Sequence, residues 1–311
     1  MPPQPLDPAA KRPFGQTKLM VTPLCVGCAP LGNMPETFAY SVSEEQALQT
    51  IRATFTSPIS FVDTAASYGD GESERRIGLV IRELGGVPNG YVVATKADRD
   101  LKTGAFTGEQ MKRSIERSLR LLGVDTLTIC HLHDPEHVSF EQITEKGGPL
   151  DVLLRYRSEG VIEHLGVAGG PIDVMIRYVE LDCFEAVITH NRYTLLNREA
   201  EPLLEMAAAR GLAVLNAAPY GSGILAKGPS AYPRYMYRAA PDEMVERARR
   251  MEAACQQANV PLAAAALQFS LRDPRITSTI VGMTRPERLT QTVELAQVPI
   301  SEDLWHELLN I

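Results

Sequence analysis

The chain has 311 residues, 44% of them apolar and 22% charged, and its 31 Lys and Arg against 38 Asp and Glu give a net charge of −7. This composition is typical of a globular protein and excludes disorder, collagen or coiled coil over the whole chain. No basic cluster points to a nucleic-acid partner, and no apolar run approaches the roughly 18 residues of a membrane helix.

Residues 1–13 contain five prolines and no apolar segment, so we expect a flexible tail there, not a secretory signal, followed by one domain over residues 14–311. The five cysteines are odd in number and scattered, which favours a reducing compartment, and we expect a cytoplasmic protein. Cys25 and Cys28 form a lone CxxC pair, for which packing in a strand is favoured over a zinc site.

Short β-rich runs alternate with helical segments along the rest of the chain. Most are almost continuously apolar, as expected of a parallel sheet covered by helices. The eight runs are residues 24–27, 59–64, 91–96, 127–133, 162–168, 184–190, 212–216 and 276–282. This alternation predicts an α/β fold, a (β/α)₈ TIM barrel. The alternative is an open doubly wound sheet, but the first βα turn, residues 27–32, lacks the GxGxxG pattern.

Helix signals lie between the runs. The segments 43–46 and 107–110 each fit a capping box, in which a hydroxyl accepts from one orphan amide and a Gln reaches back to another. After the second box, Met111, Ile115 and Leu122 share one face of the predicted helix, which indicates packing against a sheet.

Three further segments bear on the site. Residues 14–23 are expected to form a β-hairpin turning at Gly15-Gln16, which would close the bottom of the barrel. Two connections, residues 133–149 and 218–242, are long enough for lids or binding loops. Both follow strand C-termini, where barrel active sites lie, so the tyrosines at 232, 235 and 237 are candidates for substrate contacts.

Polar residues occur where predicted strands end. Asp63, Lys96 and His133 end the second, third and fourth strands, and Tyr68 lies in the loop after the second. Each has a plainer alternative, such as a turn, a helix cap or a solvated charge. Because all four would converge on one barrel mouth, the set is predicted to be catalytic.

These side chains suit proton transfer to or from an oxygen. A tyrosine has an ordinary pKa near ~10, and a lysine about 4 Å away favours the phenolate by roughly 4 kcal/mol at an effective dielectric of about 20. This predicts a Tyr68 pKa shifted toward ~7. Asp63 would hold the Lys96 ammonium, and His133 would donate to the substrate oxygen. A nicotinamide hydride would carry the electrons. The alternative is zinc held by His131 and His133, which share a strand face.

The sequence also resembles a known family. Residues 61–69 (FVDTAASYG) and 71–78 (GESERRIG) look like the aldo-keto reductase signature, and the resemblance extends over residues 14–298. The segments CAPLGN, HDP and RYTLL look most like the aldose (galactose, fucose) dehydrogenase and pyridoxal dehydrogenase branch.

The resemblance implies that NAD or NADP lies across the C-terminal face of the barrel, with Tyr68 as acid/base. The implied cofactor-binding residues are Gly27, Cys28, Asp63, His190, Tyr220, Gly221, Ser222, Gly223, Leu225, Gly282, Met283, Thr284 and Arg288. Several usual nicotinamide contacts differ, with Ala168-Gly169 for Ser-Asn, His190 or Asn191 for Gln, and Ala217 for the stacking Tyr, for which Tyr220 is a substitute. Gly282-Met283 replaces the Lys-Ser usual in NADP-preferring members while Arg288 remains, so NAD or dual use is expected.

The expected activity is oxidation of a sugar at its anomeric hydroxyl, or of another alcohol, or reduction of an aldehyde. The expected partner is a small-molecule alcohol or carbonyl substrate, with neither nucleic acid nor membrane. Two alternatives remain open: a cofactor-binding subunit that senses redox state with little turnover, and a metal-dependent barrel hydrolase.

Overall fold

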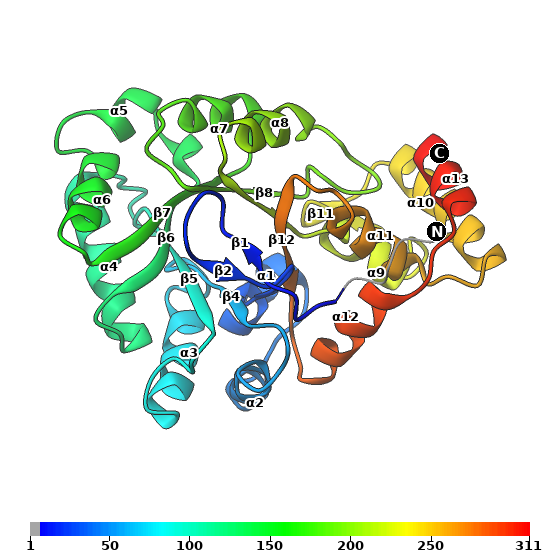
Figure 1. The fold of residues 1–311 in the computed structure, drawn as a ribbon, viewed down its shortest axis with the longest axis horizontal. Helices are drawn as coiled ribbons and strands as arrows, with labels where there is room; N and C mark the ends of the chain where they lie inside the picture. Colours follow the sequence, from blue (N-terminus) through cyan, green and yellow to red (C-terminus); the bar gives the residue numbers. More distant parts are fainter. Residues whose placement is uncertain (1–6) are drawn as a thin grey trace.

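The computed structural model describes residues 7–311. Its eight parallel barrel strands are β3 (Leu24–Gly27), β4 (Phe61–Asp63), β5 (Val92–Ala97), β6 (Leu127–His133), β7 (Ile162–Gly169), β8 (Ala186–His190), β9 (Ala213–Ala217) and β12 (Ile276–Gly282). They close in the order β12-β3-β4-β5-β6-β7-β8-β9 (Figure 1). The predicted runs match these strands to within two residues at each end, so the barrel is confirmed and the doubly wound sheet is wrong.

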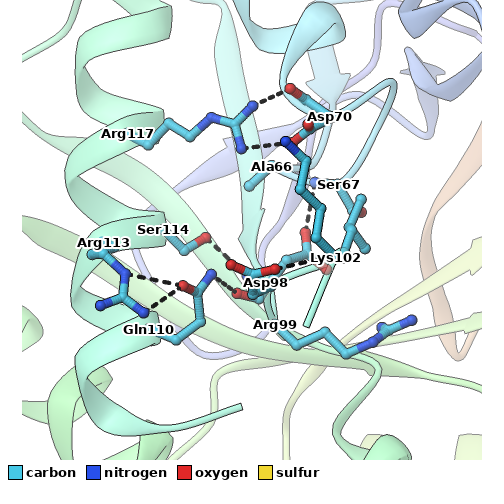
Figure 2. A pocket seen from close by; sticks show the side chains of 12 residues that line it. Ala66, Ser67, Asp70, Asp98, Arg99, Lys102, Gln110, Arg113, Ser114 and Arg117 are labelled. Carbon is cyan, nitrogen blue, oxygen red and sulfur yellow. Dashed lines mark hydrogen bonds and ion pairs between the residues drawn. The ribbon is translucent and has the colours of Figure 1, made fainter. Parts of the chain in front are cut away.

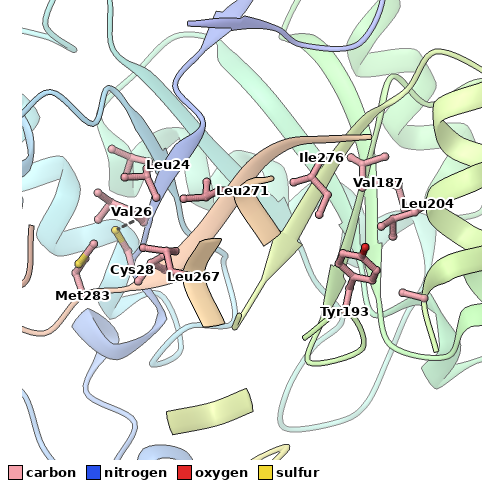
Figure 3. Close-up of a cluster of buried hydrophobic side chains, with 14 of the residues drawn as sticks. Leu24, Val26, Cys28, Val187, Tyr193, Leu204, Leu267, Leu271, Ile276 and Met283 are labelled. Atoms are coloured by element: carbon pink, nitrogen blue, oxygen red, sulfur yellow. Dashed lines mark hydrogen bonds between the residues drawn. The ribbon is translucent and has the colours of Figure 1, made fainter. Parts of the chain in front are cut away.

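Each strand is buried on both faces, which explains the continuous apolar runs. In β3, Leu24 and Val26 belong to the cluster between the strands and the helices, whereas Cys25 belongs to the cluster inside the barrel. Figure 3 shows part of the outer cluster, with Leu24, Val26 and Leu267 among its side chains. Because successive strand residues point to opposite faces, both sides must be apolar when helices cover one side and a core fills the other.

Helices surround the barrel (Figure 1). The longer ones are α2 (Glu44–Thr54), α3 (Glu72–Glu83), α4 (Gly108–Leu122), α6 (Pro149–Ser158), α7 (Ile172–Val179), α8 (Glu201–Ala209), α10 (Asp242–Gln257), α11 (Leu262–Leu271), α12 (Glu287–Gln297) and α13 (Glu302–Asn310). Short pieces are η1 (Ala29–Gly32), α1 (Pro35–Phe38), η2 (Pro135–His137), α5 (Phe140–Thr144), η3 (Gly221–Gly223) and α9 (Ile224–Lys227). None of the helices between residues 7 and 311 has the length and apolar character needed to cross a membrane.

Each of the two predicted capping boxes forms only one of its two hydrogen bonds. Ser43 and Thr107 accept from the backbone N–H groups of Gln46 and Gln110, each at 3.2 Å, as predicted. The reciprocal bonds are not made, because the Gln46 side chain donates to the carbonyl of Thr284 at 2.6 Å and that of Gln110 donates to the carbonyl of Asp98 at 3.2 Å. Tertiary partners thus replace the local ones and tie α2 and α4 to loops at the barrel mouth.

The N-terminal hairpin is present with a longer turn than predicted. β1 (Arg12–Pro13) pairs with β2 (Met20–Val21), and the N–H of Phe14 donates to the Leu19 carbonyl at 2.8 Å. The pairing of Phe14 with Leu19 puts residues 15–18 in the turn, in place of the predicted Gly15-Gln16. Phe14 is fully buried inside the barrel, edge-on to Phe61. Arg12 and Pro13 belong to this hairpin, although the tail was expected to include them; residues 1–6 of that tail lie outside the described residues.

The long connection after β9 carries a second hairpin. β10 (Arg234–Tyr235) pairs with β11 (Arg238–Ala239), and the turn residues Met236 and Tyr237 have φ of 50° and 65°. Two positive φ values are typical of the tight turns whose twist matches a hairpin. This turn presents Tyr237 at the mouth of the barrel.

Candidate active site

Four predicted residues meet at the mouth of the barrel. The Nζ of Lys96, on β5, lies 2.6 Å from Oδ2 of Asp63, at the end of β4, and 3.1 Å from the Tyr68 hydroxyl. It also donates to the Thr64 carbonyl at 2.7 Å. His133, at the end of β6, packs its ring edge-on to that of Tyr68, with 5.9 Å between the centroids. The parallel topology therefore brings together side chains that are far apart in sequence.

The loop that carries Tyr68 depends on a close backbone approach. Gly69 has φ of 63°, and a Cβ at this position would lie 2.0 Å from the carbonyl oxygen of Gly32. A residue with a side chain is excluded there, because the obstacle is backbone. Tyr68 is thereby held over Lys96, whose Nζ lies 4.7 Å from the ring centroid.

The electrostatics of Tyr68 differ from the prediction. Burial is the largest effect and raises the pKa of the phenol above its ordinary value; the Lys96 ammonium acts in the opposite direction, and the Asp63 carboxylate raises the pKa further. The predicted shift toward ~7 is therefore wrong in sign, because it counted the ammonium and neglected both burial and the carboxylate that balances it. Tyr68 holds its proton at neutral pH.

The Lys96–Asp63 pair is buried. Both residues are 2% exposed. Burial is the largest effect on Lys96 and lowers its pKa, but the Asp63 carboxylate and the Tyr68 phenol together bring that pKa above its ordinary value. For Asp63, burial raises the pKa and the Lys96 charge only partly opposes it. Lys96 is therefore a fixed cation under the tyrosine.

The histidines at the barrel mouth differ in charge state. Burial lowers the pKa of His133, yet the carboxylates of Asp134 and Asp98 bring it above its ordinary value. Burial lowers the pKa of His190 to about 4, so this side chain is neutral at pH 7. Burial, with the charges of Lys96 and His133, holds the pKa of His131 well below its usual range. His133 is the histidine suited to donate hydrogen bonds from both ring nitrogens.

Sequence reasoning missed one residue of this cluster. Oδ1 of Asp98 lies 2.7 Å from Nδ1 of His133, and the Asp98 residue is 3% exposed. Asp98 follows the last residue of β5, so the rule that selected Asp63 and His133, a polar residue at a strand end, also applies to it.

The four residues open into a cavity of about 420 Å³. Eight of the implied cofactor residues line it: Gly27, Asp63, His190, Tyr220, Ser222, Gly223, Gly282 and Arg288. Ala168, Gly169 and Ala217 line it as well, whereas Asn191 is buried behind it, where its Oδ1 accepts from the Ser222 hydroxyl at 3.1 Å.

Five implied cofactor residues do not line this cavity. The side chains of Cys28, Leu225 and Met283 are buried in the apolar cluster outside the barrel, and Figure 3 shows Cys28 and Met283 there. Gly221 packs against Tyr235, whose ring lies 2.5 Å from where a Cβ would be. Thr284 accepts the side-chain bond from Gln46 through its carbonyl.

Of the three candidate tyrosines of the long loop, Tyr237 lines the cavity, where it packs edge-on to Phe38 with centroids 5.7 Å apart. Tyr232 instead lies under the ammonium of Lys227, at 4.1 Å, and donates to the Phe38 carbonyl. Tyr235 is 4% exposed and bonds to Asn191, so its role is structural.

Metal ligation finds no support in the described part of the chain. Across residues 7–311, no group of three or more His, Cys, Asp or Glu side chains is placed to hold a metal ion. His131 lies fully buried on β6, and neither of its ring nitrogens has a hydrogen-bond partner within the described residues.

Comparison with known proteins agrees with this architecture. A model of the aldo/keto reductase family matches residues 23–311. The D-threo-aldose 1-dehydrogenase of a Pseudomonas species is 31% identical, over 93% of this chain and 94% of its own. The pyridoxal 4-dehydrogenase of Microbacterium luteolum is 29% identical over 97% of both chains. An aldo-keto reductase from Bacillus halodurans, solved in its holo form, has the same fold, with a TM-score of 0.77, 19% identity, and coverage of 96% and 95%.

The match to the family model spans the barrel strands and the residues at their C-terminal ends, and it confirms the resemblance seen in the sequence. The chain therefore belongs to the aldo/keto reductase family and is an oxidoreductase.

Proposed function

We propose that this oxidoreductase uses NAD or NADP to interconvert an alcohol and its carbonyl compound, with Tyr68 as the general acid and base. The observation that carries the proposal is the Lys96 ammonium, 3.1 Å from the Tyr68 hydroxyl and 2.6 Å from Asp63 at the wall of the cavity. These groups offer one transferable proton next to a fixed positive charge.

The cavity suits an anionic cofactor. Its acidic lining residues are Asp63 and Asp134, which lie beside Lys96 and His133, whereas Arg288 and Lys227 also line it and form no ion pair within residues 7–311. The two cations lie close enough to interact. Burial is the largest effect that lowers the pKa of Lys227, and the charge of Arg288 lowers it further. They would bind phosphate groups, and a bound nicotinamide supplies the site for gain or loss of hydride.

The protein's own residues handle the proton. In carbonyl reduction, Tyr68 donates its proton to the substrate oxygen, and the Lys96 ammonium stabilises the phenolate that remains. Asp63 holds that ammonium in place, and His133 donates a hydrogen bond to the same oxygen. In alcohol oxidation the proton moves the other way. Because burial raises the pKa of Tyr68, we expect oxidation to speed up as pH rises above neutrality, while reduction does not need a deprotonated tyrosine.

The substrate class follows from the relatives and from the cavity wall. The two relatives named above are an aldose dehydrogenase and a pyridoxal dehydrogenase. The rings of Phe38, Tyr220 and Tyr237 line this cavity beside the polar side chains of His190 and Asp134. This mixture suits a ring-shaped, hydroxylated substrate, so an aldose oxidised at C1 or an aromatic aldehyde is the first choice for an assay.

The decisive variant is Tyr68→Phe, because it removes one hydroxyl and keeps the ring. We expect unchanged cofactor binding by fluorescence titration and a loss of turnover of about 10²- to 10⁴-fold. Tyr91→Phe is the matched control, since the Tyr91 hydroxyl donates to the Ser57 carbonyl away from the cavity. Turnover by Tyr68→Phe at the wild-type rate would contradict the proposal. Cofactor binding with no turnover on a broad panel of sugars and aldehydes would favour the redox-sensing alternative.

Cofactor preference has its own test. Gly282 offers no side chain to a 2′-phosphate. In the segment that follows β12, Arg288 lines the cavity, whereas Arg285 pairs with Glu287. We propose NAD or dual use on this basis. Titration with NADH and NADPH, repeated on Arg288→Ala, measures the difference; a loss of NADPH affinity much larger than that of NADH would assign the 2′-phosphate contact to Arg288. An equal loss of affinity for NADH and NADPH would indicate that Arg288 contacts a group that the two cofactors share.

A further inference from the structure

We propose that Asp98 is a positioning residue for His133: it accepts the Nδ1–H hydrogen bond and favours the doubly protonated imidazolium, whose Nε2–H can donate to the substrate. The inference deepens the proposed function and rests on it. It starts from a contact that the family resemblance did not imply, the 2.7 Å approach of Oδ1 of Asp98 to Nδ1 of His133.

The Asp98 carboxylate is held in one orientation. Its Oδ2 accepts the backbone N–H of Ser67 at 2.9 Å, while its own N–H donates to Oγ of Ser114 at 2.9 Å. The side chain of Gln110 donates to the Asp98 carbonyl at 3.2 Å. Figure 2 shows these bonds converging on Asp98 from α4 and from the loop after β4. The carboxylate is therefore oriented before any substrate arrives.

The chemistry of the two groups fixes the position of the proton. An ionised carboxylate only accepts hydrogen bonds, so Nδ1 of His133 must be the donor. The Ser67 hydroxyl, 3.4 Å from Nδ1, is a longer second contact. With Nδ1 occupied, the nitrogen that remains for the substrate is Nε2, which lies 3.7 Å from the Asp134 carboxylate.

No other cation competes for Asp98. Figure 2 shows several basic side chains around a second cavity, of about 360 Å³, that Asp98 also lines. Arg117 pairs with Asp70, and Arg113 bonds to Gln110. Within residues 7–311, no Lys or Arg side chain forms an ion pair with Asp98, so its charge acts on His133.

The charges around His133 come from four strands and the segments next to them. Asp98 and Asp134 favour the charged imidazolium, whereas burial and the Lys96 ammonium oppose it. The groups that face the ring are Asp63 from β4, Lys96 and Asp98 from β5 and the residue after it, His131 and Asp134 from β6 and the residue after it, and His190 from β8. The side chain of Asp134 is 29% exposed and that of Asp98 only 4%, so the Asp98 charge is the less screened. Asp134 acts through its charge from 3.7 Å, whereas Asp98 adds a hydrogen bond at 2.7 Å to its charge, so we expect loss of Asp98 to weaken the charged form.

In the reaction, Tyr68 and His133 then have different roles. Tyr68 gives or takes the proton, and the charged form of His133 orients the substrate oxygen through Nε2–H. Loss of Asp98 should then lower kcat more than it raises KM, because the hydrogen bond from His133 is worth most where charge develops on the oxygen.

The test is a titration of His133 itself, which needs neither substrate nor turnover. Protein labelled with ¹⁵N-histidine is followed by NMR across pH, and the His133 signals are assigned by their loss in His133→Gln. In the wild type we expect a neutral form protonated on Nδ1 and a titration above the ordinary pKa near ~6.5. In Asp98→Asn we expect the pKa to fall by about 1 to 3 units, as for removal of an opposite charge within hydrogen-bonding distance.

The matched control is Asp100→Asn. Asp100 lies on the same loop, and its Oδ1 accepts the backbone N–H groups of Lys102 and Thr103, away from His133. This variant should leave the His133 titration unchanged. Asp98→Glu restores the charge and should recover part of the shift. In kinetics, Asp98→Asn should lower kcat about 10-fold or more, with its pH profile displaced in the same direction as the NMR titration.

Two results would overturn the inference. One is a wild-type His133 whose neutral form carries its proton on Nε2, a result that needs no Asp98 variant to fold. The other is a His133 pKa in Asp98→Asn within about half a unit of the wild type. Failure of the proposed function is separate, because it would appear as full turnover by Tyr68→Phe while the titration of His133 stayed as described.

Discussion

Replacement of Lys96 by Met tests the buried charge arrangement most directly. The substitution keeps an unbranched side chain, one atom shorter, and removes the ammonium. The Asp63 carboxylate, 2% exposed, is left without its cation. The Oδ1 atom of Asp63 has no hydrogen-bond partner within the described residues, and of the charges around Asp63 only that of His133 remains to oppose its burial. Removal of one partner of a buried ion pair costs about 3–5 kcal/mol, a large part of the 5–15 kcal/mol that stabilises a typical protein.

The loss should depend on pH in a defined direction. In Lys96→Met the carboxylate of Asp63 loses the charge that opposes its burial, so its folded-state pKa rises further above the unfolded-state value. The folded protein then binds a proton that the unfolded chain has released, and stability falls as pH rises between the two pKa values, by about 1.4 kcal/mol per unit. We expect a small loss at pH 5 and the full loss at pH 8.

The measurement is urea unfolding at both pH values without cofactor, on the wild type, Lys96→Met, Asp63→Asn and the double variant. The double variant should be more stable than Lys96→Met alone by about 2 kcal/mol or more, because it leaves no unpaired charge. A loss below about 1 kcal/mol for Lys96→Met at pH 8, or effects of the two substitutions that simply add, would refute the reasoning.

Three further predictions concern stability. Glu74 is fully buried, and burial raises its pKa from 4.5 to about 7, so wild-type stability should fall by about 3 kcal/mol relative to Glu74→Gln between pH 4.5 and 7, measured by urea unfolding; equal pH profiles would contradict this. Gly78→Ala should destabilise by about 1–3 kcal/mol or more, because its Cβ would lie 1.9 Å from the Leu121 carbonyl oxygen, whereas a gain in thermal midpoint would rule out that contact. Thr107→Ala should cost about 1 kcal/mol through loss of the α4 cap, read from the denaturation midpoint, with no change in kcat.

Strand topology alone was enough to predict which candidate residues meet at the mouth of the barrel. Asp63, Lys96 and His133 were identified because parallel strands end at one face, and Tyr68 because it follows one of those ends. Asp98 satisfied the same criterion and was overlooked, since the contact on which its proposed role rests joins residues 35 positions apart in the sequence.

The sign of the Tyr68 pKa shift was beyond the same reasoning. One ammonium near a phenol predicts a lowered pKa, but the observed direction depends on how much water burial removes and on the Asp63 carboxylate beyond the ammonium. The desolvation of Tyr68 and the net effect of the charges near it depend on all the groups around the phenol in the folded protein. The capping glutamines are a similar case, because Gln46 finds the Thr284 carbonyl 238 residues away in place of its local partner.

The sequence alone predicts the order of the strands, their two buried faces and the polar residues at their ends. These features depend on periodicity and spacing, which are local and can be recognised before the fold is known. Which groups are within hydrogen-bonding reach, which charges are balanced and which lie in water are decided only when the barrel closes. Electrostatic energy depends on separations of a few ångströms and on solvent exclusion. The spacing of residues along the chain determines neither of them.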